Sequence, residues 1–160
     1  MKTESHKEHQ WLLKWVGEWT MEAESFMGPD QPLFKSTGTE TVRAVGDLWI
    51  QGSGQGEMPG GGTGYMVVTL GYDPQRERFV GTWIGSMMAY LWIYEGTLDE
   101  SGRKLILDTT GPDMSGKGGT SKYREEIEVA DSDHRIWKSY APAPDGGWQN
   151  FMTAHYRRKA

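Results

Sequence analysis

The first residues of the chain have the spacing of an amphipathic helix. Apolar side chains recur on one helical face, at Trp11, Leu12, Trp15 and Val16. Ser5 precedes Glu8 by three residues, as in a capping box, and Gly17 can end the helix in a left-handed conformation. The pattern predicts a short helix over residues 6–16. An isolated helix of this length is marginally stable, so we expect its tryptophan face to dock on the rest of the protein.

From Gly17 onward the apolar residues recur at every second position instead. Over residues 17–27 apolar and polar side chains alternate, which is typical of a strand with one buried face. Turn signals such as Asp73-Pro74 separate the strand candidates that follow. These candidates are residues 36–45, 48–57, 64–72, 77–86, 90–98, 103–110, 120–130, 134–141 and 147–157.

Regular strands joined by short turns favour an antiparallel meander. About ten strands in one sheet leave two unpaired edges unless the sheet closes on itself. We therefore predict one all-β domain over residues 1–160, a single antiparallel meander β-barrel with the short helix plugging one end. The segment from Gly52 to Gly64 is the richest in glycine. We expect it to be the most mobile part of the chain, either a simple hairpin or a lid over a ligand at the barrel mouth.

Composition narrows the classes of function. The 160 residues include no cysteine, which excludes disulfides, thiolate metal sites and a cysteine nucleophile. Acidic residues outnumber basic ones by 22 to 17, giving a net charge of −5, so we expect no nucleic-acid partner. The N-terminus lacks the apolar run of a signal peptide, and no segment approaches the roughly 18 apolar residues of a membrane span. We expect a cytoplasmic protein with no membrane partner.

One acidic residue, Glu125, occupies a position where the alternation predicts an apolar side chain. Glu125 shares the phase of Tyr123 and Ile127 and is therefore expected to point into the barrel. A carboxyl group in that position must be paired or carry a raised pKa, whether its role is structural or functional. Arg43 and His155 are the candidate partners.

The histidines offer weaker signals. His155 is in phase with Phe151 on the last predicted strand, but alternation alone does not decide which phase of that strand faces inward. His6 and His9 are three residues apart on the predicted helix, where we expect them to be exposed. Two imidazoles without a third ligand make a weak site, so no metal is predicted.

The most apolar stretch is the hairpin at residues 82–92, which would line either a ligand pocket or an ordinary core. Met87 and Met88 fall at its expected turn, where flexible thioethers suit an adaptable rim. The candidate ligand-binding residues are Arg43, Met66, Trp83, Met88, Tyr90, Trp92, Glu125, Phe151 and His155.

Three functions remain open. The preferred hypothesis is a protein that binds a hydrophobic small molecule without catalysis or a cofactor, with Arg43 holding a carboxylate or carbonyl group of the ligand. The second is an acid/base enzyme, an isomerase or hydrolase, that uses Glu125 and His155 inside the barrel. The third is a protein-interaction module with exposed tryptophan or methionine at the rim. Self-association into a homodimer through one sheet face also stays open.

Several segments resemble a bacterial family of unknown function, DUF1579. They are Gly71-Tyr72-Asp73-Pro74, Phe79–Ile84 with Ser86-Met87, Glu95-Gly96, Leu13 to Trp19, and the closing Tyr156-Arg157-Arg158. The resemblance implies a calycin-like barrel similar to lipocalins, fatty-acid-binding proteins and nitrobindins, and it implies no activity. Gly17, Trp19 and Arg157 or Arg158 would match the tryptophan–arginine packing at the base of lipocalin-like barrels.

The resemblance to nitrobindins also bears on haem. Nitrobindin-like proteins ligate haem iron through a histidine on their final strand. The matching position here is Phe151, and a phenyl ring has no lone pair to offer iron. His155 lies four residues further on, about 13 Å along an extended strand. We therefore predict that the protein does not bind haem in this manner.

Overall fold

The structure is a computed structural model that describes residues 3–160, and within that range it contains one helix and ten strands. The helix, α1, spans Lys7–Leu13. The strands are β1 (Gly17–Ser25), β2 (Phe34–Val45), β3 (Trp49–Glu57), β4 (Thr63–Asp73), β5 (Arg78–Gly85), β6 (Trp92–Leu98), β7 (Lys104–Pro112), β8 (Thr120–Asp131), β9 (His134–Pro142) and β10 (Trp148–Arg158). Among these residues there is no candidate for a membrane-spanning helix.

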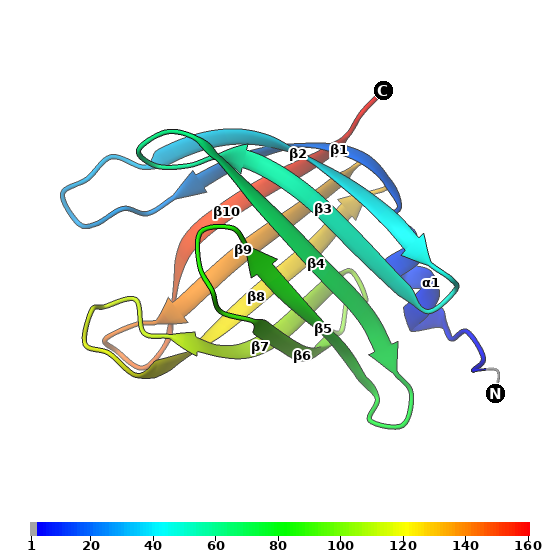
Figure 1. The fold of residues 1–160 in the computed structure, drawn as a ribbon. Coiled ribbons are helices and arrows are strands. Elements are labelled where there is room, and N and C mark those ends of the chain that lie inside the picture. The colour runs from blue at the N-terminus through cyan, green and yellow to red at the C-terminus, as the bar shows by residue number, and fades with distance from the viewer. Residues whose placement is uncertain (1–2) are drawn as a thin grey trace.

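The ten strands form one closed sheet (Figure 1). Each strand pairs antiparallel with its neighbours in sequence, and β10 returns to pair with β1, where Trp19 lies opposite Arg158 and Ala23 opposite Ala154. Closure removes the two edges that an open sheet of this size would leave unpaired. The predicted all-β meander barrel is confirmed, and each predicted strand overlaps one observed strand.

The alternation in the sequence is an alternation between the two faces of the barrel wall. In β1, Trp19, Met21 and Ala23 are buried, whereas Glu18 and Thr20 between them are exposed. Successive side chains of a strand point to opposite faces, so the apolar set of each strand converges on the inside of the barrel.

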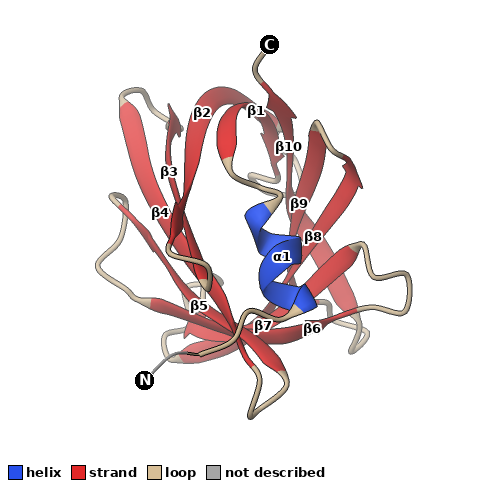
Figure 2. Ribbon diagram, turned by 90° about the vertical axis from the view of Figure 1, so that its right-hand side faces the viewer, coloured by secondary structure: helices blue, strands red, loops and turns tan. Residues whose placement is uncertain are grey.

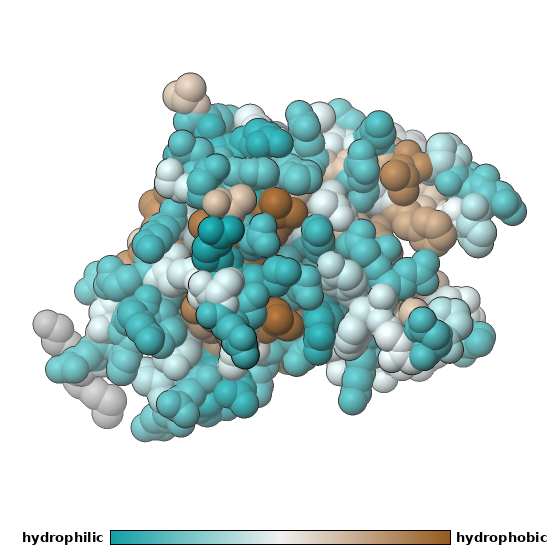
Figure 3. Space-filling view, turned by 180° about the vertical axis from the view of Figure 1, so that it is seen from behind, coloured by the Kyte–Doolittle hydropathy of each residue, from teal (hydrophilic) through white to brown (hydrophobic). Residues whose placement is uncertain are grey.

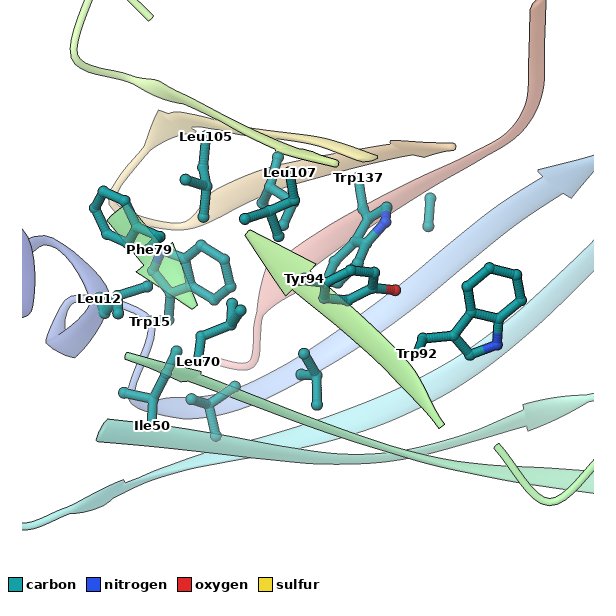
Figure 4. Packing of buried hydrophobic residues seen from close by; sticks show 14 of the residues in the cluster. Leu12, Trp15, Ile50, Leu70, Phe79, Trp92, Tyr94, Leu105, Leu107 and Trp137 are labelled. Carbon is teal, nitrogen blue, oxygen red and sulfur yellow. The ribbon is translucent and has the colours of Figure 1, made fainter. Parts of the chain in front are cut away.

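The helix lies across one open end of the barrel, as predicted (Figure 2). Beneath it, apolar side chains from α1 and several strands form a continuous core, which includes Leu12, Trp15, Ile50, Leu70, Phe79 and Leu105 (Figure 4). Trp15 is 2% exposed, and Trp11 is half-buried with its ring edge-on to Trp15. The helix is shorter than predicted. The backbone N–H groups of Trp15 and Val16 donate to carbonyls three residues back, so the chain tightens and leaves the α-helix after Leu13.

The start of the helix departs from the prediction in two ways. Its N-cap residue is His6 rather than Ser5, and His9, which was expected to be exposed, is 2% exposed. The His9 Nδ1 atom accepts a hydrogen bond of 2.8 Å from the backbone N–H of His6, which leaves Nε2 to donate to the carbonyl of Tyr72 at 2.9 Å. His9 therefore ties the helix to β4 through a partner that helical periodicity does not show.

Arg158 fastens the end of the chain to its beginning. Its guanidinium lies over the ring of Trp19 at 4.3 Å and donates to the backbone carbonyls of Lys14, Val16 and Ser132. A side chain at Gly17 would collide with this guanidinium, since a Cβ atom there would lie 2.4 Å from Nη1. Of the two arginines that the lipocalin resemblance left open, Arg158 makes the contact with the tryptophan.

Two predictions overlap in the glycine-rich segment, a strand over residues 48–57 and a mobile loop over residues 52–64, and the strand is the one observed. Gly52 to Glu57 belong to β3 and pair with β2 and β4, and the ladder resumes at Thr63. The turn is confined to residues 58–62. The expectation of a mobile loop over the whole of residues 52–64 was therefore wrong. The glycines of β3 sit in regular strand pairs because both neighbouring strands supply hydrogen bonds along their length.

A β-bulge changes the phase of the last strand. Asn150 pairs with Tyr140 and Met152 pairs with Ser139, so Phe151 is an extra residue without a partner on β9. Met152 and Ala154 face the interior after the bulge, and His155 consequently faces outward. The shared phase of Phe151 and His155 in the sequence does not survive, because the inserted residue shifts the alternation by one position.

Candidate functional site: an internal cavity

The barrel holds a cavity of about 460 Å3 that begins beyond the core at the helix end. Methionine and aromatic side chains make up much of its wall, among them Met21, Met66, Trp83, Trp92 and Phe151. Loop residues at the end opposite the helix, including Met58, Met87 and Met114, line its mouth. In the space-filling view this end of the molecule is hollowed, with apolar residues inside the hollow (Figure 3).

Three glycines on β3 keep the cavity empty on one side. Gly52, Gly54 and Gly56 alternate with exposed residues and all line the cavity. A Cβ atom at Gly52 would lie 2.9 Å from a carboxylate oxygen of Glu40, and one at Gly56 would lie 3.2 Å from the end of Met21. The missing side chains therefore provide both the free volume and the room for the neighbouring Glu40.

Glu125 points into the cavity, as the phase of its strand predicted. It is 7% exposed, and one of its oxygens, Oε2, accepts both protein hydrogen bonds, from the indole N–H of Trp137 at 2.7 Å and from the hydroxyl of Ser139 at 2.5 Å. Burial raises the pKa of the Glu125 carboxyl to about 7, although these two hydrogen bonds lower it. The group can therefore change its charge near neutral pH.

Two tyrosines share the electrostatic environment of Glu125. Burial raises the pKa of the Tyr94 hydroxyl well above its usual range, and the charges of Glu125 and Tyr156 raise it further. The pKa of Tyr156 is also raised, first by burial and then by the charge of Glu40. In the close-up view the Tyr94 hydroxyl points away from the helix end (Figure 4). These hydroxyl groups stay neutral at ordinary pH, so they can both donate and accept hydrogen bonds.

A buried ion pair lies between the helix-end core and the cavity. The Arg135 guanidinium contacts a carboxylate oxygen of Glu40, with Arg135 1% exposed and Glu40 7% exposed. The rings of Trp15, Trp19 and Tyr156 cover the guanidinium at 4.3–4.8 Å. Sequence reasoning missed this pair, although a signal existed. Both residues lie in the buried phase of their strands, as Glu125 does.

The structure brings six of the nine candidate site residues together around the cavity: Met66, Trp83, Met88, Trp92, Glu125 and Phe151. Arg43, Tyr90 and His155 do not line it. Arg43 is exposed and donates to the side chain of Gln51 at 2.7 Å, so it is neither a partner of Glu125 nor a handle for a ligand inside the barrel. Tyr90 donates its hydroxyl to a backbone carbonyl on β7 and packs against Trp92.

The outward orientation of His155 removes the proposed acid/base pair. Its Nδ1 atom lies 2.9 Å from Nε2 of His134, and the two rings stack at the outer surface of the barrel. Burial lowers the pKa of His134, and the nearby Arg157 lowers it further. Glu125 faces the opposite side of the wall, so the two groups cannot act on one substrate inside the barrel.

A protein-family model described as "Protein of unknown function (DUF1579)" matches residues 4–158. The chain belongs to this family. The resemblance seen in the sequence is therefore confirmed for nearly the whole DUF1579 chain. No curated protein sequence matches it.

Solved structures share the fold of this DUF1579 protein. Rv2717c from M. tuberculosis has a TM-score of 0.68 at 14% identity, covering 98% of this chain and 100% of that one. The S-type phycobiliprotein lyase CPES from Guillardia theta has a TM-score of 0.60 at 18% identity, with 94% and 92% covered. EF1p2_mFAP2b bound to DFHBI has a TM-score of 0.51 at 12% identity, with 95% and 99% covered. At such identities the likeness shows the fold alone.

The cavity of the DUF1579 protein does not fit haem ligation of the nitrobindin type. Within residues 3–160 no histidine lines the cavity, whereas Phe151 does and His155 faces outward. The absence of such haem binding stays a prediction, which these side-chain positions support.

Proposed function

We propose that the protein binds an apolar small molecule non-covalently inside its barrel. The observation that carries the proposal is the cavity of about 460 Å3, walled by methionine and aromatic side chains. Ligand pockets typically measure about 300–1,000 Å3 and combine apolar walls with a few polar groups. Here the lining is mostly apolar, and Glu125, Tyr94 and Tyr156 are among the few polar groups on it.

The construction of the cavity supports this proposal over that of an imperfectly packed core. A core is filled at close to crystalline density, and side chains large enough to fill this space are common in strands. Instead three glycines lie on one wall, and flexible thioethers line the mouth. Methionine adapts its shape to different apolar partners. A solved barrel of the same fold is bound to the small molecule DFHBI, which is consistent with the proposal and does not identify the ligand here.

A filled-cavity variant tests the proposal. In Gly56→Leu an isobutyl group would enter the cavity, and its nearest side-chain neighbour is the flexible end of Met21, so the barrel should still fold. Gln55→Leu is the matched control, because it adds a similar apolar group to the exposed face of the same strand. Binding would be followed by titrating each protein with Nile red, a neutral apolar dye.

We expect saturable one-to-one dye binding by the wild type and by Gln55→Leu. Gly56→Leu should weaken that binding at least about tenfold, a difference of about 1.4 kcal/mol in binding free energy. Circular dichroism would check that the variant keeps its β-structure. The proposal fails if the wild type does not bind saturably, or if the dye binds a folded Gly56→Leu as tightly as it binds the control.

A further inference from the structure

We infer that the ligand carries a protonated amine, which ion-pairs with Glu125 inside the barrel while its apolar part fills the cavity towards the mouth. This inference rests on the proposed function and adds the chemical class of the ligand. It replaces the expectation of a carboxylate or carbonyl group held by Arg43, which the exposed position of Arg43 rules out.

The charges around the cavity favour a cation. Its lining includes three carboxyl side chains, Glu40, Glu57 and Glu125, and among residues 3–160 it includes no lysine, arginine or histidine. Glu40 is neutralised by Arg135, which contacts it from beneath a cover of aromatic rings. Within residues 3–160, the buried carboxyl of Glu125 accepts hydrogen bonds only from two neutral donors, Trp137 and Ser139. A ligand carboxylate would add a second negative charge beside it, whereas an ammonium would supply the missing positive charge.

The arrangement of acceptors suits an ammonium group. Both protein donors of Glu125 use the same oxygen, Oε2, so Oε1 accepts neither of them and is left for a ligand. Tyr94 and Tyr156 are close enough to interact electrostatically with Glu125, and their hydroxyl oxygens can accept hydrogen bonds. An ammonium carries three N–H donors, and these three side chains offer three acceptors.

The aromatic walls contribute to the same selectivity. Trp92 and Trp137 line the cavity together with the two tyrosines. The faces of such rings attract cations, most strongly where water is excluded. The aromatic side chains around Glu125 should therefore favour an organic cation over an anion.

Amine binding should be linked to protonation of Glu125. The groups around Glu125 are Tyr94 on β6, Trp137 and Ser139 on β9, and Tyr156 on β10, and the charged Glu40–Arg135 pair on β2 and β9 interacts with Tyr156. Burial raises the pKa of Glu125 to about 7, so the carboxyl is mostly neutral at pH 6 and mostly ionised at pH 8. An alkylamine remains protonated throughout this range, because its pKa is about 10. Its affinity should therefore rise about tenfold between pH 6 and pH 8.

The experiment compares decylamine, decan-1-ol and decanoate, which share one alkyl chain and differ in their polar end. Binding to the full chain would be measured by tryptophan fluorescence and calorimetry. At pH 8 we expect decylamine to bind about 10- to 100-fold more tightly than decan-1-ol, because charge-assisted hydrogen bonds are stronger than neutral ones. Decanoate should bind most weakly, because its negative charge would lie beside the ionised carboxylate of Glu125.

Two isosteric variants locate the effect. In Glu125→Gln the amine should lose its advantage over the alcohol and its dependence on pH, while binding of the alcohol stays unchanged. Glu126→Gln is the matched control, because it removes one negative charge from the outer face of the same strand, where Glu126 pairs with Lys104 at 3.8 Å. It should keep the wild-type preference.

The outcomes separate this inference from the proposed function. If decanoate binds more tightly than decylamine, or if folded Glu125→Gln keeps the amine preference, the inference is overturned and barrel binding still stands. If Glu125→Gln does not fold, the wild type is tested alone, and the inference is overturned if decylamine binds no more tightly than decan-1-ol at pH 8. If none of the three compounds binds and Nile red also fails, both proposals fall.

Discussion

Breaking the buried ion pair from one side should cost this barrel more than breaking any surface pair. In Glu40→Gln the carboxylate that contacts Arg135 would become a neutral amide of nearly the same shape. Arg135 is 1% exposed, and within residues 3–160 its Nε and Nη1 atoms are buried without a hydrogen-bond partner. The amide oxygen of glutamine could still accept a hydrogen bond, but the substitution would leave the charged, buried guanidinium without a counter-charge.

The expected loss is about 3–5 kcal/mol in the free energy of unfolding, the usual effect of removing one partner from a buried pair. Domains of about this size are stable by about 5–15 kcal/mol, so the loss is a large fraction of the total. Each kcal/mol lowers the melting temperature by about 2–4 °C, which predicts a drop of about 6–20 °C. The aromatic rings over the guanidinium attract the cation and do not replace its counter-charge.

Urea unfolding at pH 7, in low salt and in 1 M NaCl, measures this loss. A buried pair is poorly screened, so the loss should persist at high salt. Asp108→Asn serves as the control, because Asp108 pairs with Arg124 at 3.4 Å with both side chains partly exposed, and its removal should cost less than about 1 kcal/mol. The double variant Glu40→Leu/Arg135→Met should be more stable than Glu40→Gln, because it leaves no unpaired charge.

The reasoning would be refuted by a loss below about 1 kcal/mol in Glu40→Gln, or by a loss that disappears in 1 M NaCl. Either result would mean that water reaches the guanidinium and that the pair is not a dry contact.

Three further predictions concern stability. Trp15→Ala should cost about 3–5 kcal/mol and Trp11→Ala less than half of that in urea unfolding, because Trp15 is 2% exposed and Trp11 is half-buried; equal losses would contradict this packing. The fold raises the pKa of Glu125 from 4.5 to about 7 and so favours its neutral form. The contribution of neutral Glu125 to the free energy of unfolding is therefore fully present below about pH 4.5 and is lost as the pH rises through about 7. Relative to Glu125→Gln, the wild type should thus lose about 3 kcal/mol between pH 4 and pH 8, and parallel stability profiles would count against this assignment. Arg158→Lys should cost about 1–2 kcal/mol, because one ammonium cannot bond three backbone carbonyls and cover Trp19 at the same time; a melting temperature equal to that of the wild type would argue against this role.

Local periodicity in the sequence was sufficient to predict the helix and strands and to predict that Glu125 points into the barrel. Strand alternation depends on backbone geometry alone, so a carboxyl group in phase with Tyr123 and Ile127 must share their face of the sheet. The same argument applied to Glu40 and Arg135 would have placed both inside the barrel. It could not have paired them, because they lie 95 residues apart and meet only when the barrel closes.

Other features depended on the packed barrel. The bulge at Phe151 adds one residue to β10 relative to β9, and it decides that His155 faces outward. A bulge is a property of two paired strands, so the sequence of one strand does not show it. The glycines of β3 resemble a flexible loop in the sequence, and they form a strand because the neighbouring strands hydrogen-bond along both of its edges. The sequence by itself therefore determined the strands, the barrel and the inward phase of Glu125, whereas tertiary pairing decided which side chains meet in the cavity, because register and closure depend on contacts between segments far apart in the chain.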